Sequence, residues 1–386
     1  MSDNKNVLVF NYDKDLPKVG SLKRKYLQDK VIELSKIPQP VQKSAEWYTM
    51  RETMLTASDW GAILGDSPYD DGTEVLLVKC GKEKKFPKSA MDAMDWGNKY
   101  EDVAVAVYKY RNKIDVWDFG CIQHPFIPFL GASPDGITPD GVMLEIKCPS
   151  RRVIDGITPA YYWCQVQGQL EVCDLDRCDF LECNFKEYSS EMKYLDDNFE
   201  GDNTRNKFGH EKGVIAEFYR KDDVNKKHFY EYSAVNILGD ELQEWKSNIV
   251  DKSDSNIVFD CFSYWYLENV SCIPIYRNHI WFQESKPILE DFWNLVLKYR
   301  SLGLDKLIED VSLKKAIKKI ERDEKRDAKK KESEKRRMKT IRDFISLDDD
   351  STAISQTNNI NSVDNFEEPD DFSVTSISNS GKSLFR

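Results

Sequence analysis

Several features of common protein classes are missing from this sequence of 386 residues. No apolar run approaches the roughly 20 residues that a membrane-spanning helix needs. The first dozen residues lack a basic start followed by an apolar block, so we expect no signal peptide. No glycine-rich phosphate-binding loop is present, so the sequence does not indicate ATP use. The four histidines are scattered without ligand spacing, and no local motif supports a Ser/His/Asp or Cys/His nucleophile.

Cysteine occurs nine times but never as a CxxC pair. An odd count without close pairs favours free thiols, and therefore a reducing, intracellular compartment. Cys173, Cys178 and Cys183 are evenly spaced, which leaves an iron–sulfur cluster as an alternative. Soft-metal sites usually use tighter cysteine pairs, so we interpret the three side chains as small buried thiols.

The sequence does contain enough apolar material for a folded core, and its charge is unevenly distributed. Hydrophobic residues make up 40% and aromatic residues 12% of the chain. The formal net charge of −11 argues against a protein that coats DNA. However, residues 314–339 include 14 basic and 6 acidic residues, whereas residues 347–386 include 8 acidic and 2 basic residues. The overall charge therefore hides a basic segment followed by an acidic tail.

We expect four parts along the chain. A polar N-terminal stretch is interpreted as a loosely structured arm, the patterned middle as one domain, and the last two segments as a charged helix and a disordered acidic tail. The charged helix has two interpretations. It binds nucleic acid electrostatically, or it is a solvated helix with ion pairs at i, i+4 spacing. The predicted boundaries are 1–42, 43–305, 306–346 and 347–386.

The order of elements in the middle of the chain is typical of an α/β fold with a mixed sheet. Apolar residues recur at steps of three and four in the longest helical pattern, and strand-like runs separated by turn residues follow it. An extension from about residue 186 adds aromatic-rich strands and further helices, and it carries no catalytic motif. The predicted series is a helix at 92–112, strands at 115–123, 129–133 and 142–148, a helix at 159–173 and a strand at 178–185.

Three acids and one lysine stand out by their positions. Asp135 lies in a turn that closes one predicted strand, and Glu145 and Lys147 lie on the next strand with one residue between them. Side chains alternate between the faces of a strand, so Glu145 and Lys147 point the same way while Ile146 points into the core. A hairpin would bring Asp135 near that face, and Glu101 lies on the preceding helix.

This combination suits a hard divalent cation. Mg²⁺ takes one or two carboxylates, waters and substrate phosphate oxygens, and Mn²⁺ is the alternative ion. Asp135, Glu145 and the carbonyl of Ile146 would be ligands, and Glu101 would add charge directly or through water. Lys147 would orient or deprotonate the attacking water.

Each of these residues also has a simpler structural interpretation. Glu101 would be a solvent-facing helix acid, Asp135 a turn former, and Glu145 with Lys147 an exposed pair on a strand. The apolar residues around Glu145 predict a buried strand, where unpaired charges are costly. This burial favours a functional site over an exposed pair.

Several short motifs occur in the order found in one nuclease family. They are Trp47-x-x-x-Arg51, Thr56-Ala57-Ser58, Gly97-x-x-x-Glu101, Ser133-Pro134-Asp135-Gly136, Glu145-Ile146-Lys147-Cys148-Pro149 and Tyr162-x-x-Gln165-x-Gln167. Together they resemble the motif series of the YqaJ/lambda-exonuclease family of PD-(D/E)xK nucleases. The resemblance covers about residues 44–185, and it does not reach the N-terminal arm, the aromatic-rich extension or the tail.

The resemblance implies a restriction-endonuclease-like core, in which helices flank a mixed central sheet. It also implies a role for each matching residue. The set comprises metal ligands (Asp135, Glu145 and the Ile146 carbonyl), a helix carboxylate serving the metal (Glu101), a water-orienting lysine (Lys147), supports on the following helix (Gln165 and Tyr162) and a pair that binds a 5′-phosphate (Arg51 and Ser58). Structural alternatives are a surface arginine at 51, a strand cap at 165 and a core tyrosine at 162.

The function implied by the resemblance is a Mg²⁺-dependent exonuclease that degrades linear duplex DNA, from 5′ to 3′, in viral or phage recombination, repair or replication. The alternatives are a nicking or structure-specific endonuclease of the same fold and an inactive DNA-binding recombination scaffold. The implied partners are double-stranded DNA, a single-strand annealing protein and further copies of the chain, since lambda-type members form trimers. A viral source, and with it the host cytoplasm or a viral replication site, is likewise an expectation from the resemblance.

Overall fold

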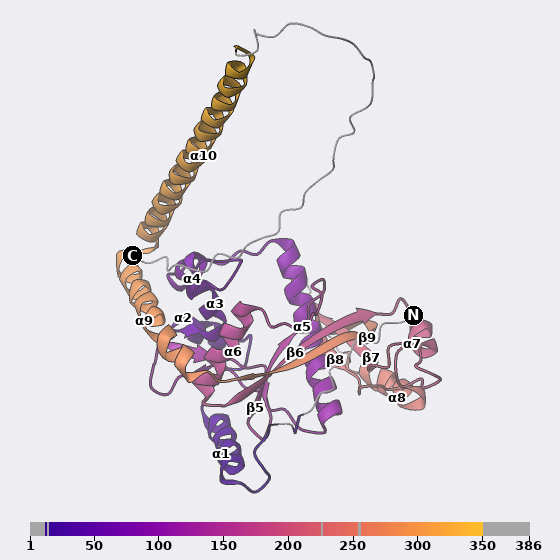
Figure 1. The fold of residues 1–386 in the computed structure, drawn as a ribbon. Helices are drawn as coiled ribbons and strands as arrows, with labels where there is room; N and C mark the ends of the chain where they lie inside the picture. Colours follow the sequence, from indigo (N-terminus) through magenta and orange to yellow (C-terminus); the bar gives the residue numbers. More distant parts are fainter. Residues whose placement is uncertain (1–11, 14, 225–226, 254–255, 350–386) are drawn as a thin grey trace, which may run out of the picture. The chain divides into compact units, whose positions relative to one another are not determined.

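The fold was analysed in a computed structural model of the chain (Figure 1). The structure describes residues 12–13, 15–224, 227–253 and 256–349, with the side chains of residues 339–349 left out. The chain divides into two compact units, residues 1–304 and residues 305–386. The predicted disordered tail lies largely outside the described residues.

The centre of the first unit is a six-stranded mixed sheet (Figure 1). One neighbouring pair, β5 with β6, is parallel, and the other four pairs are antiparallel. In spatial order the strands are β4 (Gly136–Ile137), β5 (Val142–Lys147), β6 (Arg177–Glu187), β9 (Ile257–Tyr276), β7 (Lys212–Arg220) and β8 (Phe229–Tyr232). The sheet confirms the expected mixed α/β class.

Helices cover both faces of this sheet. The helix α5 (Lys88–Asn112) packs its Tyr100, Val103 and Val107 side chains against one face, where Leu144 and Ile146 of β5 join the same apolar core. On the other face, α6 (Ala160–Cys173) packs against Met143 and Phe180 through a second core, which includes Val166 and Leu170. Successive residues of β5 thus alternate between the two cores, as strand geometry requires.

The first unit also contains a smaller sheet and three short helices that precede α5. The strand order of this smaller sheet is β1 (Leu55–Thr56), β3 (Leu130–Ala132) and β2 (Ile122–Gln123). The helices are α2 (Ala45–Glu52), α3 (Ala57–Ile63) and α4 (Thr73–Lys79). The backbone N–H and hydroxyl of Thr56 both donate to the Asp59 carboxylate at 2.9 Å, which fixes the expected start of α3. A Cβ on Gly168 would lie 2.9 Å from the Trp60 ring, so glycine allows α3 and α6 to pack closely.

The N-terminal stretch is more ordered than the polar arm that the sequence suggests. Helix α1 (Leu22–Lys36) buries Leu27, Val31 and Leu34 in the same core as α6. The Nε of Arg24 also donates to Asp140 at 2.8 Å, which ties α1 to the turn before β5. Only three apolar side chains, at steps of four and three, form the buried stripe, and the many charged residues between them hide it in the sequence.

The strand predicted at residues 115–123 is wrong over most of its length. Only Ile122 and Gln123 form a strand, and Trp117 makes an isolated bridge to Ile137. The backbone N–H of Gly120 instead donates to the side chain of Gln39 at 2.6 Å. A Cβ on Gly120 would lie 2.0 Å from the Pro40 carbonyl, so the N-terminal segment packs directly against this stretch.

The extension after residue 186 completes the large sheet. Strand β9 is the longest, and it lies between β6 and β7, so the extension and the core share one sheet (Figure 1). The sequence predicted β7, β8 and the helices that follow them, but it missed β9. The helices of this region are α7 (Glu191–Asp196), α8 (Gly239–Val250) and α9 (His279–Leu302).

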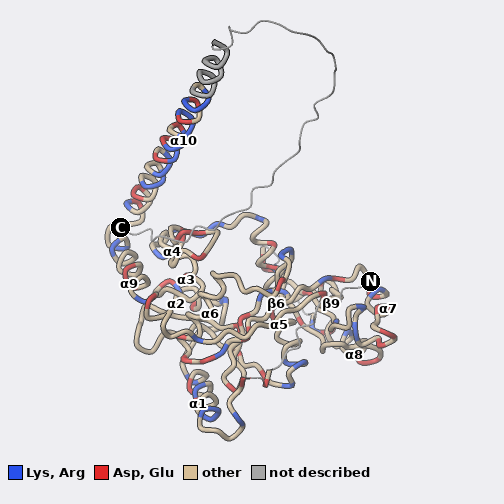
Figure 2. The backbone as a smooth tube through the Cα atoms, viewed as in Figure 1, with Lys and Arg blue, Asp and Glu red and all other residues tan. Residues whose placement is uncertain are grey.

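The described part of the second unit consists of the helix α10 (Leu304–Asp349), which confirms the predicted charged helix. Basic and acidic residues alternate along it (Figure 2). Lys306 pairs with Asp310 at 3.0 Å, and Arg336 pairs with Glu332 at 2.6 Å, both at the i, i+4 spacing.

Two further observations concern the chain as a whole. None of the helices in the described ranges combines the length and the apolar character that crossing a bilayer requires. All nine cysteines are free, and Cys173, Cys178 and Cys183 are fully buried, as expected for small apolar thiols.

Candidate active site

The hairpin of β4 and β5 places Asp135 beside the end of β5. Gly136 pairs with Leu144 across this hairpin, so the residue before Gly136 lies level with the following part of β5. The backbone N–H of Ile146 donates to Oδ2 of Asp135 at 2.6 Å. The expected turn therefore exists, and its aspartate is fixed against the strand that carries the Glu-x-Lys pair.

Glu145 is the most enclosed charged residue of the site, with 1% of its surface exposed. It points to the α6 side of the sheet, where two amides hold its carboxylate. Nε2 of Gln165 donates to Oε1 at 2.7 Å, and Nε2 of Gln169 donates to Oε2 at 2.6 Å. The ammonium of Lys147 also donates to Oε1. A buried carboxylate with three charged or polar donors has a fixed orientation.

Lys147 lies between the acids and an aromatic ring. Its Nζ is 4.6 Å from the ring centroid of Tyr162, a distance typical of a cation–π contact. Burial alone would lower the pKa of the ammonium, but the negative charges of Glu145 and Asp135 outweigh burial and raise it. Lys147 is thus held in its charged, proton-donating form.

Glu101 approaches the site from α5. The thiol of Cys148, directly after β5, donates to the backbone carbonyl of Tyr100 at 3.5 Å, which ties this turn of α5 to the strand end. Burial, Glu145 and Glu101 raise the pKa of Asp135 well above its ordinary value. The negative charges of Glu145 and Glu101 therefore act on the Asp135 carboxyl group. Lys43 forms an ion pair with Glu101 at 3.2 Å.

The donor set fits a hard divalent ion. Among the residues that the structure describes, no three His, Cys, Asp or Glu side chains are arranged to hold a metal ion by themselves. Asp135 and Glu145 supply two carboxylates beside the backbone of Ile146, and Mg²⁺ commonly uses one or two carboxylates with water and phosphate oxygens. The negative charge that raises the pKa of Asp135 is the charge that such an ion would neutralise.

Arg51 and Ser58 meet at the surface near this hairpin. Nη2 of Arg51 donates to the Ser58 hydroxyl at 2.9 Å, and its guanidinium lies 4.3 Å from the Trp47 ring. The indole N–H of Trp47 donates to the hydroxyl of Ser133 at 3.0 Å. Trp47 therefore connects the arginine to the turn that carries Asp135.

The structure also adds residues that sequence reasoning missed. Gln169 contacts the same carboxylate as Gln165, and Lys43 contacts Glu101. Gln167, which belongs to the sequence motif, lies elsewhere: its side chain bonds to the backbone of Tyr276 and Asn278. The spacing of four residues from Gln165 was the available signal for Gln169, because such residues share one face of a helix.

Comparison with known families agrees with this arrangement. Residues 46–176 match the model of the YqaJ-like viral recombinase domain. This part of the chain is therefore similar to the YqaJ-like viral recombinase domain. The matched range contains the smaller sheet, α5, the hairpin and α6, and it ends just before β6. The matched range therefore includes every site residue that the sequence predicted, whereas Lys43 and the extension from about residue 186 lie outside it.

Two viral proteins are similar to parts of the chain. The uncharacterized protein R354 of Acanthamoeba polyphaga mimivirus is 34% identical over 337 residues, which covers 78% of this chain and 60% of R354. A protein of African swine fever virus is 26% identical over 162 residues, which covers 34% of this chain and 46% of that viral protein. The chain thus spans about 60% of the length of the first relative and less than half of the second.

Solved structures of exonucleases are similar over most of their length. The alkaline exonuclease LHK-Exo of Laribacter hongkongensis has a TM-score of 0.39 and 17% identity, and the match covers 70% of this chain and 98% of LHK-Exo. A phage-related exonuclease from Haemophilus somnus has a TM-score of 0.34 and 11% identity, with 67% and 96% covered. Scores this low carry no argument about the site.

Proposed function

We propose that this chain is a Mg²⁺-dependent DNA exonuclease that hydrolyses linear duplex DNA from a 5′ end, in recombination of viral DNA. One observation carries the proposal: Asp135, Glu145 and Lys147 meet at the end of β5, with two amides fixing the buried glutamate. The match to the YqaJ-like viral recombinase domain, which covers these residues, supports DNA as the substrate and recombination as the setting.

The roles of the residues follow from their contacts. Asp135, Glu145 and the Ile146 carbonyl would hold Mg²⁺, which when bound supplies an activated water and neutralises charge on the scissile phosphate. Glu101 would contribute through water. Gln165 and Gln169 keep the Glu145 carboxylate in one orientation.

Lys147 has the hydrogen-bonding role. Its ammonium is held by Glu145 and the ring of Tyr162, so it can orient the attacking water and donate to the phosphate oxygen. The negative charges of Glu145 and Asp135 raise the pKa of Lys147, which supports the donor role among the two roles that the sequence allowed.

The 5′ preference is proposed from Arg51 and Ser58. Their guanidinium and hydroxyl groups are in contact, and a terminal phosphate between them would accept from both. The aromatic face of Trp47 restricts the arginine to this orientation. A single-strand annealing protein and a trimeric assembly are further proposals that follow from the resemblance alone.

The test is a nuclease assay on end-labelled linear duplex beside closed circular plasmid, with Mg²⁺ or EDTA. Wild type should degrade only the linear DNA, only with Mg²⁺, and Glu145→Ala should abolish the activity. Cutting of the circle would replace the exonuclease by an endonuclease of the same fold. Cutting of neither substrate, with Mg²⁺ or Mn²⁺, would favour the scaffold.

A further inference from the structure

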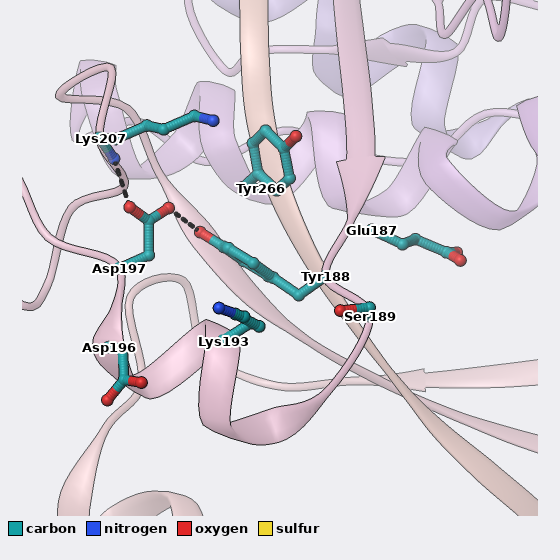
Figure 3. A pocket seen from close by; sticks show the side chains of 8 residues that line it. All are labelled: Glu187, Tyr188, Ser189, Lys193, Asp196, Asp197, Lys207 and Tyr266. Atoms are coloured by element: carbon teal, nitrogen blue, oxygen red, sulfur yellow. Dashed lines mark hydrogen bonds between the residues drawn. The ribbon is translucent and has the colours of Figure 1, made fainter.

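Two cavities lie in the region that the motif series leaves unexplained. One, of about 450 Å³, is lined by three carboxylates and two lysines, so it has no surplus of positive charge. Figure 3 shows its Tyr188 hydroxyl directed at Asp197, to which it donates at 2.6 Å. The backbone N–H of Lys207 donates to the same carboxylate at 3.0 Å. These groups satisfy one another, and an anionic ligand would meet net negative charge.

The second cavity, of about 540 Å³, has the opposite charge. We name it the basic aromatic pocket, and it is formed by the end of α5 and the loop before β7. Three cationic side chains face one carboxylate, which leaves two positive charges in excess. Its main lining residues are Tyr110, Arg111, Lys113, Arg205, Phe208 and Glu211.

Glu211 organises the two arginines. It is buried, with 1% of its surface exposed, and it accepts from Nε and Nη2 of Arg111 at 3.0 and 2.6 Å. Nη1 of Arg205 donates to the same carboxylate at 2.8 Å. The Nδ1 atom of His210 lies 3.1 Å from Nη2 of Arg111, and burial together with Arg111 lowers the histidine pKa, so this nitrogen is an acceptor. Both guanidinium groups are therefore preorganised at the pocket wall.

Aromatic rings complete the lining. Tyr110, Phe199 and Phe208 expose 36%, 40% and 43% of their surfaces, unlike the buried rings of the core. Arg205 and Lys113 lie 5.6 and 4.2 Å from the centroid of the Tyr110 ring. Half-exposed rings beside cations form the combination on which bases stack while phosphates meet positive charge.

We infer that the basic aromatic pocket binds a nucleotide unit of single-stranded DNA. A cavity of this size holds a ligand as large as one nucleotide. A base within a duplex has both faces covered by its neighbours, so it cannot stack on the half-exposed rings of Phe199 or Phe208, whereas an unpaired base can. An acidic peptide would use the cations but not the ring faces.

The inference deepens the proposed function. It rests on that function in one respect only, because exonuclease activity would produce the single-stranded DNA. Removal of one strand from its 5′ end leaves the other unpaired. Arg111 follows Glu101 by ten residues on α5, which corresponds to about 15 Å along the helix axis. This separation along the helix corresponds to the length of a few nucleotides.

The experiment measures binding without catalysis. The full chain is titrated in EDTA against a fluorescein-labelled oligonucleotide of about 20 thymidines, and anisotropy gives Kd. Phe208→Ala and Arg205→Gln should each raise Kd by about tenfold, because each removes one stacking or phosphate contact. The exposed Lys113→Gln provides a second charge variant in case Arg205→Gln disturbs folding, which circular dichroism melting reveals. Phe126→Ala and Lys186→Gln are matched controls outside the pocket lining and should leave Kd unchanged.

The outcomes separate this inference from the proposed nuclease. Loss of binding in the pocket variants supports the inference even if the chain proves to have no nuclease activity. Unchanged Kd in folded variants would overturn it, whatever the nuclease assay shows. Equal weakening of blunt duplex binding would show a general DNA contact instead and would also overturn it. Thymidine monophosphate is added as a competitor at the same nucleotide concentration as the oligonucleotide. If it displaces the oligonucleotide, the pocket binds a free nucleotide, and the assignment of single-stranded DNA is overturned.

Discussion

Neighbouring residues of one turn of α5, Lys99 and Glu101, belong to two charge clusters with different electrostatics. At the first, Nζ of Lys99 donates to Glu187 at 2.6 Å, to Glu217 at 2.8 Å and to Ser263 at 2.9 Å. The hydroxyl of Tyr100 adds a further bond to Glu187 at 2.7 Å. At the second cluster, Glu101 and the acids of the hairpin meet Lys147. Both clusters combine acids with a lysine, Lys99 being buried and Lys147 partly buried.

The pKa shifts of the two clusters run in opposite directions. Burial would raise the pKa of Glu217, but hydrogen bonds from Lys99 and Ser263 lower it below its ordinary value. Burial also raises the pKa of Asp135, and there Glu145 and Glu101 raise it further. Both carboxylates of the Lys99 cluster bond to the lysine, and we interpret this cluster as structural. In the hairpin cluster the neighbouring acids raise the pKa of Asp135, which is typical of a site that takes a cation from outside.

The largest expected difference comes from removing each lysine. Lys99→Met leaves the buried Glu217 without its cation, removes the partner of the exposed Glu187, and should destabilise the fold by about 3 kcal/mol. Lys147→Met should change stability much less, because the amides still hold Glu145, but it should reduce nuclease activity by about a hundredfold or more. Urea unfolding and the nuclease assay provide the two readouts. Equal destabilisation by both substitutions would remove the distinction between the clusters.

The next effect concerns the amides that orient Glu145. Gln169→Ala removes one donor and should lower nuclease activity by about ten- to a hundredfold, as for other residues that hold a metal ligand. Gln167→Ala on the same helix is the control. It breaks bonds to the backbone beyond β9, so it should lower stability by about 1 kcal/mol and leave activity intact. A reversal of these two results would refute the assignment of Gln169.

A smaller effect is expected at the surface arginine. Arg51→Gln should reduce the preference for duplex with a 5′-phosphate over a 5′-hydroxyl end by about tenfold, since it removes a charged donor. Initial rates on the two substrates give this ratio. Lys186→Gln, with the same change in charge at a distant strand, should leave the ratio unchanged. If Arg51→Gln slows both substrates equally, the arginine does not read the terminal phosphate.

The smallest effect is the pH dependence of the structural cluster. The folded pKa of Glu217 is below its ordinary value of 4.5, so its stabilising contribution is complete above that pH and is lost as the pH falls through the folded pKa. Glu217→Gln should therefore cost about 1 kcal/mol near neutral pH, and the difference should shrink below pH 4.5. Urea unfolding of both proteins at several pH values measures it. A difference in unfolding free energy that does not change with pH would show that the ionisation of Glu217 is not its cause.

The sequence predicted the local geometry of the hairpin because strong turn residues and a short apolar strand specify it. The alternation in β5 placed Glu145 and Lys147 on one face and Ile146 in the core, and the structure has this arrangement. Asp135 bonds to the backbone of Ile146 as the turn implied. These relations involve residues close together in the chain, where spacing alone determines which side chains meet.

Long-range relations were not accessible in this way. Strand β9 was missed because polar residues such as Asp260 and Asn269 interrupt its apolar pattern, and its place between β6 and β7 depends on pairing over many residues. The helix α1 was hidden by charged residues around its narrow buried stripe. The basic aromatic pocket likewise joins α5 to a loop about a hundred residues later, and Glu211 could not be linked to Arg111 from spacing.

The central claim is that the carboxylates beside β5 form a divalent-metal site. Isothermal titration calorimetry of the DNA-free protein with Mg²⁺, and with Mn²⁺ as a check, tests it directly. We predict binding to wild type, at least about tenfold weaker binding to Asp135→Asn, and unchanged binding to Glu217→Gln, which alters the structural cluster only. Equal binding by wild type and Asp135→Asn would contradict the account.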